Sequence, residues 1–106
     1  MPKYLFKVSY SSEGARGIAK EGGTSRRDTI GKLAQNTGGT MESFYFAFGE
    51  DDAYVICDLA DNATAASVAL AVNSSGAAQV TTVVLMTPEE LDEATRKSVD
   101  YRPPGA

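Results

Sequence analysis

The chain has 106 residues, of which 42% are hydrophobic and 23% are charged, and its net charge at pH 7 is −4. These proportions are those of an ordinary globular protein, so they exclude a chain that is disordered throughout, and the length predicts one domain. The ten Lys and Arg residues are scattered among fourteen acids without forming a basic stripe, which argues against a nucleic-acid partner.

The first predicted element is a strand over residues 4–10, where aromatic and β-branched side chains alternate with other side chains. A helix in two segments follows, beginning near Ser11 and interrupted at Gly22-Gly23. Ser25 is the expected start of the second segment, because its hydroxyl can cap free backbone N–H groups. Gly38-Gly39 then supplies a left-handed stop, so the helical region ends there.

Residues 40–59 form a predicted β-hairpin at the centre of the chain. Its two apolar runs, 43–48 and 54–59, are joined by the polar turn 49–52. Both runs are apolar on successive rather than alternate residues, which is typical of strands covered on both faces. A chain this short has helices enough for one face, so the pattern predicts that a partner chain covers the other.

The remaining elements are an Ala-rich helix, a strongly β-branched strand over residues 77–86, and a helix whose cap is Thr87. The end of the chain, residues 99–106, contains two prolines and a glycine and cannot stay helical. We therefore expect a single domain over residues 1–98, followed by an extended Pro-rich tail over 99–106.

The order of these elements is β-α-β-β-α-β, which is the ferredoxin-like arrangement of the α+β class. Handed crossovers place both main helices on one face of a four-stranded antiparallel sheet. The predicted fold is this sheet with helices on one face, plus a C-terminal helix and the extended tail.

At the turn, the chain resembles the GYD-domain family, which belongs to the dimeric α/β-barrel group of ferredoxin-like folds. The motif residues are Gly49 and Asp52, followed by the strand residues 53–56, while Asp51 stands where the family has its aromatic residue. The resemblance covers residues 4–93. It implies a dimeric α/β barrel, and hence a homodimer or higher homo-oligomer whose sheets pack face to face. It assigns no chemistry, because fold does not carry function.

The two faces of the hairpin can be assigned if Phe48 pairs with Asp52 across the turn. Under that register Tyr45, Ala47 and the alternate residues of 53–59 turn toward the helices. On the first strand the apolar set Tyr4, Phe6, Val8 and Tyr10 then faces the helices as well, which leaves Leu5, Lys7 and Ser9 toward the partner sheet. The residues predicted to face the partner sheet are then Glu42, Phe44, Phe46, Phe48, Tyr54, Ile56 and Asp58.

Five residues on this predicted outer face form the candidate site. In the functional interpretation they line a cavity in which a lysine holds an anionic or carbonyl group over an aromatic wall. In the alternative interpretation that lysine pairs with a carboxylate at the edge of an interface. The five residues are Lys7, Glu42, Phe46, Tyr54 and Asp58.

Several kinds of chemistry are excluded because the chain has no histidine and one cysteine, Cys57. A Ser-His-Asp triad, His-ligated haem or zinc, and a multi-cysteine site all require residues that are absent, so no cofactor and no metal are expected. Cys57 itself fits a buried small hydrophobe. The acids 50–52 fit a solvated turn better than a cation site, and Arg26-Arg27 fits a solvated pair better than a phosphate site.

No segment approaches the roughly 20 apolar residues of a membrane span, and the N-terminus lacks the apolar stretch of a signal peptide. We therefore expect a cytoplasmic protein without a membrane partner.

Three functions fit the sequence. The first is a homo-oligomer that holds a small molecule in its dimer barrel or cleft. The second is a cofactor-independent monooxygenase or isomerase that uses Tyr54, Lys7 and Asp58. The third is a structural assembly subunit whose Pro-rich tail clasps a neighbour.

Overall fold

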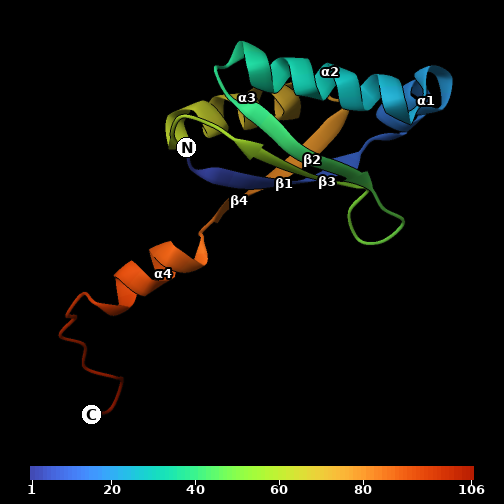
Figure 1. Ribbon diagram of the computed structural model, residues 1–106. Helices are drawn as coiled ribbons and strands as arrows, with labels where there is room; N and C mark the ends of the chain where they lie inside the picture. Colours follow the sequence, from blue (N-terminus) through green and yellow to red (C-terminus); the bar gives the residue numbers. More distant parts are fainter.

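Eight elements follow one another in the computed structural model, which describes residues 1–106 (Figure 1). Their order confirms the predicted β-α-β-β-α-β succession, with the first helix in two segments and a further helix at the C-terminus. The elements are β1 (Lys3–Tyr10), α1 (Ser12–Glu21), α2 (Gly23–Asn36), β2 (Thr40–Phe46), β3 (Ala53–Asp58), α3 (Asn62–Ser74), β4 (Ala78–Leu85) and α4 (Pro88–Thr95).

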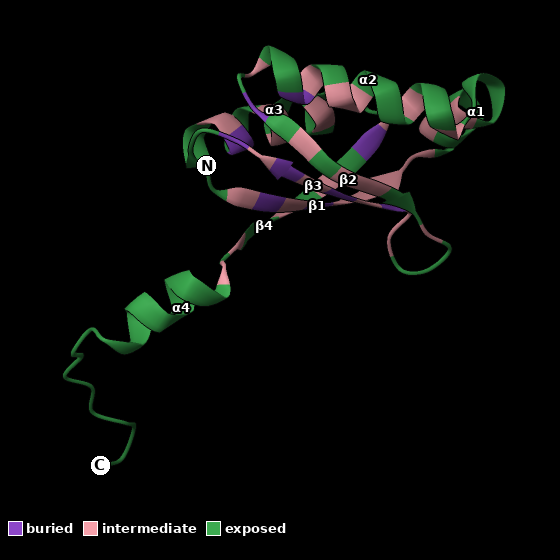
Figure 2. Ribbon diagram, in the orientation of Figure 1, coloured by how far each residue is buried: buried purple, intermediate pink, exposed green.

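The four strands form one antiparallel sheet in the order β2-β3-β1-β4, which is consistent with a ferredoxin-like fold. Helices α1, α2 and α3 all lie on the same side of this sheet (Figure 1). We call the side that they cover the closed face and the opposite side the open face. No helix lies over the open face (Figure 2).

The core lies between the closed face and the helices. Tyr4 and Leu59 are each 1% exposed, and Cys57 is 4% exposed. From the helices, Ala34 of α2 and Ala65 of α3 complete this cluster, and their small side chains allow the backbones to approach the sheet closely. The predicted division of β1 and β3 between the two faces is therefore confirmed.

The predicted register of the hairpin is wrong by one residue for the end of β2. Phe46 lies opposite Ala53 and Phe44 lies opposite Val55, so both phenylalanines are on the closed face. Tyr45, opposite Tyr54, is on the open face instead. A one-residue shift in a strand exchanges its two faces completely.

The cause is the length of the connection between the strands. The backbone N–H of Ala47 donates to the carbonyl of Asp52, so Phe48 lies in the loop, where its side chain is fully exposed. Farther along β2 the pairing shifts again between Met41 and Ser43, which makes Glu42 the extra residue of a β-bulge. The bulge returns the Glu42 side chain to the open face, where it meets Lys3.

The helix starts explain the two segments before β2. The Ser11 hydroxyl accepts a hydrogen bond from the N–H of Gly14 and caps α1. Gly22, with φ +89°, then breaks the helix, because that backbone conformation is strained for any other residue. The N-cap of the second segment is Gly22 rather than Ser25, so the expected start is three residues late.

The C-terminal arm, which we define as residues 87–106, projects away from the sheet and its helices (Figure 1). Thr87 caps α4 in a complete capping box with Glu90, as the sequence predicts. Every residue from Pro88 to Ala106 is exposed (Figure 2). None of the helices has the length and apolar character needed to cross a bilayer.

Candidate functional site

The open face carries apolar side chains from the three strands β1, β3 and β4. The pairing of the strands places Leu5 beside Ile56 on one side and beside Val83 on the other. Tyr54 and Leu85 belong to the same face, and none of these five side chains is buried. The open face is thus an apolar surface against which no other part of the chain packs.

A charged cluster lies at one end of this face. The Lys3 ammonium donates hydrogen bonds to Asp58 Oδ1 at 2.9 Å and to Glu42 Oε1 at 3.0 Å. These bonds, above all the one that Lys3 donates to Asp58, raise the pKa of Lys3 above its ordinary value. The structure therefore brings together the predicted Glu42 and Asp58, but around Lys3, which is not one of the five predicted site residues.

Lys7, the lysine of the predicted site, lies opposite Tyr54 in β3 and Thr81 in β4. It forms no ion pair, since the ion pairs of the chain belong to Lys3 and Arg27. Four residues along β3 separate Tyr54 from Asp58, which corresponds to about 13 Å of strand. Within one chain, Lys7 and Tyr54 therefore form one group and Asp58 belongs to another.

Phe46 is the predicted site residue that the structure removes from the open face. Its ring makes an edge-to-face contact with Phe44, with centroids 5.0 Å apart. It also lies against Gly23, where an added Cβ would come within 2.9 Å of the ring. Phe46 packs against the start of α2, so it cannot provide an aromatic wall for Lys7.

The acidic turn is tied to the end of β1. Asp52 accepts a hydrogen bond from the N–H of Tyr10 at 2.8 Å, and its own N–H donates to the carbonyl of Val8 at 2.8 Å. Asp51 accepts a longer bond, 3.4 Å, from the Ser9 hydroxyl. These contacts hold the loop in place, and no group of three or more potential metal-ligating side chains gathers in the structure.

Cys57 lies on the closed face, as its place in β3 predicts. Burial, with a smaller contribution from the charge of Asp58, raises the pKa of its thiol to about 11. At neutral pH the thiol is therefore protonated and weakly nucleophilic. This agrees with the interpretation of Cys57 as a buried small hydrophobe.

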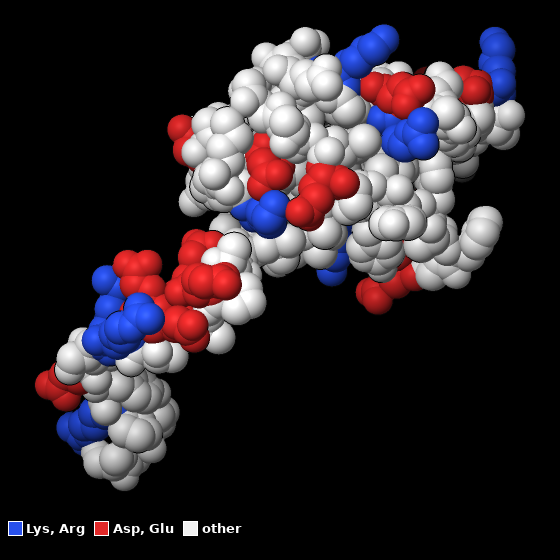
Figure 3. Space-filling model, viewed as in Figure 1, with Lys and Arg blue, Asp and Glu red and all other residues white.

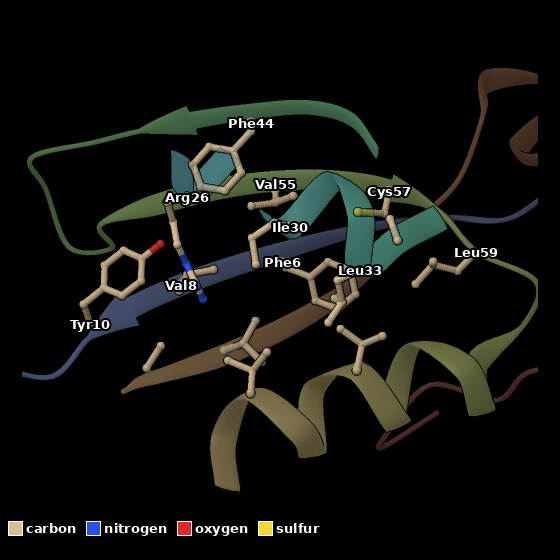
Figure 4. A pocket seen from close by; sticks show the side chains of 15 residues that line it. Phe6, Val8, Tyr10, Arg26, Ile30, Leu33, Phe44, Val55, Cys57 and Leu59 are labelled. Carbon is tan, nitrogen blue, oxygen red and sulfur yellow. The ribbon is translucent and has the colours of Figure 1, made fainter. Parts of the chain in front are cut away.

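A cavity of about 40 Å³ lies beneath the helices, between α2, α3 and the closed face (Figure 4). Of its 15 lining residues 14 are hydrophobic, and the remaining one is Arg26. The Tyr10 side chain lies at the same end of the cavity and points toward Arg26 (Figure 4). Burial raises the pKa of Tyr10, and the neighbouring Arg26 partly offsets this rise.

The sequence predicts a solvated pair at Arg26-Arg27, and this prediction is correct only for Arg27. Arg27 is exposed and pairs with Asp28 at 3.1 Å. The signal for Arg26 was its helical spacing, because Arg26 precedes Ile30 by four residues and therefore lies on the apolar stripe of α2. Elsewhere on the visible surface the charges of both signs are interspersed, with acids gathered over α4 (Figure 3).

Comparison with known proteins shows a match to a family. The family model described as GYD domain matches residues 4–95 of the chain. No curated protein and no solved structure matches it.

Proposed function

The chain belongs to the GYD-domain family, and from this membership and its bare apolar sheet face we propose that the protein is a homo-oligomer. In its smallest form, a dimer, the open faces of two copies pack against each other and enclose a site for a small molecule. The observation that carries the proposal is the open face itself, which no helix covers (Figure 2).

The energetics favour covering this face. Fully burying a side chain such as Leu5, Ile56 or Leu85 contributes about 1.5–3 kcal/mol relative to leaving it in water. Five apolar side chains from each copy are enough to offset an association cost of several kcal/mol. The ion pairs of Lys3 lie at the end of the open face. In the proposed dimer they would belong to the polar rim that surrounds the apolar contact.

The small-molecule site is proposed around Lys7 and Tyr54, which lie opposite each other on the two central strands. An unpaired ammonium group enclosed between two sheets would require a partner, because a buried charge without one is costly. A ligand with a carboxylate or carbonyl group meets that requirement, and the Tyr54 ring supplies an apolar contact. The ligand class that we propose is therefore a small anionic or carbonyl compound.

Oligomer formation is tested by sedimentation equilibrium at micromolar concentration. The expected mass is at least twice the 11.2 kDa of one chain. Ile56→Glu places a charge on the open face and should release folded monomers. Leu70→Glu, at a side chain of α3 that is 69% exposed, is the matched control and should leave the mass unchanged. A stable monomer of the unaltered chain would overturn the proposal.

Ligand binding is tested by native mass spectrometry of the oligomer after incubation with a mixture of small carboxylates and ketones. We expect a bound mass that Lys7→Met removes and that Lys20→Met, on the exposed side of α1, retains. An oligomer of normal mass that binds none of these compounds would restrict the function to assembly.

One observation favours another of the three functions, that of a structural assembly subunit. In the C-terminal arm, Leu91, Val99 and Tyr101 are 57%, 79% and 67% exposed, and the arm does not pack on its own chain. An arm of this kind can bind a neighbouring copy. Replacing Leu91 with Asp should then reduce the size of the assembly beyond the dimer, whereas Ile56→Glu should abolish the dimer itself.

A further inference from the structure

The cavity beneath the helices is on the face of the sheet that the proposed oligomer does not use. Val68 and Val72 of α3, Ile30 and Leu33 of α2, and closed-face residues of the sheet line it (Figure 4). Its volume is about 40 Å³, and a cavity measured in this way needs about 10–15 Å³ to hold one water molecule. It therefore has room for about three water-sized groups, but its walls offer them few hydrogen bonds.

The charged residue of the wall has unused hydrogen-bonding capacity. The Nε atom of Arg26 is buried and has no hydrogen-bond partner. Arg26 also takes part in none of the ion pairs of the chain. A buried donor on a guanidinium is costly to leave unpaired, and its planar fork matches a carboxylate. The wall thus combines an apolar interior with a single cationic donor at one end.

The same end of the cavity adjoins the protein surface. Tyr10, Arg26 and Ala78 belong to the cavity wall, and Tyr10 and Arg26 also line a hollow on the surface beside α1. These two side chains therefore separate the interior from solvent. A rotation of either side chain would open a path between the hollow and the cavity.

We propose that this cavity binds a short, branched carboxylate, whose head group pairs with Arg26 and whose apolar body lies among the valines of α3 and β4. The head group would accept hydrogen bonds from the Arg26 guanidinium and from the Tyr10 hydroxyl. The size of the cavity selects a body of about three to four carbon atoms, given room for about three water-sized groups. Longer acyl chains would require α2 and α3 to separate.

Three acids face the entrance and oppose an anion there. Glu13 and Glu21 line the surface hollow, and Asp52 accepts a hydrogen bond from the backbone of Tyr10. None of them pairs with Arg26, and Glu13 and Glu21 are exposed, so solvent and salt screen their charges. The buried Nε atom of Arg26 is screened much less, which favours the anion once it is inside.

The test uses the full chain and isovalerate as the probe, with isovaleramide as the neutral compound of the same shape. Backbone amide NMR shifts are followed during titration. For isovalerate we expect saturable shifts at residues of α2, α3 and the closed face, complete below roughly 10 mM, as suits a ligand of so few atoms. Isovaleramide should bind about tenfold to a hundredfold more weakly, the range for loss of a charge-assisted hydrogen bond.

Two substitutions on α2 separate the specific contact from general electrostatics. Arg26→Met should weaken isovalerate binding by about tenfold to a hundredfold. Arg27→Met removes the same charge from the adjacent exposed position and should leave the affinity unchanged. Equal binding of isovalerate by Arg26→Met and the unaltered chain, or no shifts below 10 mM in the unaltered chain, would overturn the proposal.

A second pair of variants keeps the inference testable if Arg26→Met does not fold. Val72→Phe fills the cavity and should abolish isovalerate binding, whereas Leu70→Phe enlarges an exposed side chain of the same helix and should not. In the unaltered chain, bound isovalerate should also slow methylation of Cys57, whose side chain lines the cavity. Shifts confined to the open face, with Cys57 methylation unchanged, would assign the binding to the other face and refute this site.

Discussion

The closed and open faces of the sheet are built from alternate residues of the same strands, yet they depend on different partners. In β3, Ala53, Val55 and Cys57 are buried under the chain's own helices, whereas Tyr54 and Ile56 are only partly buried on the other side. The closed face is completed within one chain, and the open face is not. Substitutions at neighbouring positions can therefore separate folding from association.

The largest difference between the two faces is expected for loss of an apolar side chain. Leu59, directly after β3, is 1% exposed, and Leu59→Ala should lower the free energy of unfolding by about 2–5 kcal/mol. Ile56→Ala, on the open face, should have a smaller effect at low protein concentration, with a loss that grows as concentration favours the oligomer. Urea denaturation at several protein concentrations measures the loss in the free energy of unfolding for both variants. Losses that are equal and independent of concentration would contradict the division between the faces.

The next largest effect on stability is expected where helix α1 lies close to the backbone of Ala77. A Cβ added at Gly14 of α1 would lie 2.0 Å from the carbonyl oxygen of Ala77, whereas one added at Gly17 would meet nothing within 4 Å. Gly14→Ala should therefore destabilise the protein by about 1–3 kcal/mol, the usual cost of overpacking. Gly17→Ala should stabilise it by about 0.5–1 kcal/mol, because alanine restricts the unfolded chain and favours the helix.

Thermal unfolding of the two variants side by side measures this contrast. The two glycines are three residues apart on one helix, so each is the control for the other. Two variants of equal stability would show that α1 can move away from Ala77 at little cost.

The thiol of Cys57 should make stability depend on alkaline pH. Its pKa is raised from 9.0 to about 11 in the folded chain, so above pH 9 the unfolded chain loses a proton that the folded chain keeps. Stability then falls as pH rises from 9 to 11, by about 1–2 kcal/mol once partial solvent screening is allowed for. Urea denaturation from pH 8 to 11 measures the difference in the free energy of unfolding between the unaltered chain and Cys57→Ala. This difference separates the effect of the Cys57 thiol from the titration of Tyr10 and the lysines. A constant difference would show that the thiol is not desolvated.

The sequence predicts most of the closed face because alternation within β1 and β3 depends only on neighbouring residues. Tyr4 and Phe6 are buried where the period of two places them. The end of β2 is different, because its faces depend on which residues close the turn. A loop that starts one residue earlier and a bulge at Glu42 are backbone hydrogen-bonding choices that side-chain pattern does not encode.

The candidate site was predictable to the same partial extent. Alternation placed Lys7, Tyr54 and Asp58 on one face, which the structure confirms. It gave no means of choosing between Lys3 and Lys7 as the partner of the carboxylates, since both lysines lie on that face. The choice follows from the pairing of β1 with β3, which sets Lys3 opposite Asp58. Arg26 could have been recognised from its position on the apolar stripe of α2.

The smallest effect is expected for the charged cluster of the open face, because Lys3 is solvated and its ion pairs are screened by salt. Lys3→Met should lower the melting temperature slightly at low ionic strength, and the decrease should vanish in 1 M NaCl. The raised pKa of Lys3 also determines how its stabilising effect changes with pH. The contribution of Lys3 to the free energy of unfolding is complete below its ordinary pKa of 10.5, and it is lost as the pH rises through the raised pKa. Lys7→Met, which breaks no ion pair, should leave the monomer's melting temperature unchanged and act on the oligomer alone. Both substitutions can be compared in the monomeric Ile56→Glu variant. If Lys7→Met lowers the melting temperature of that variant more than Lys3→Met does, then Lys7 stabilises the single chain. The open face would then not serve association alone.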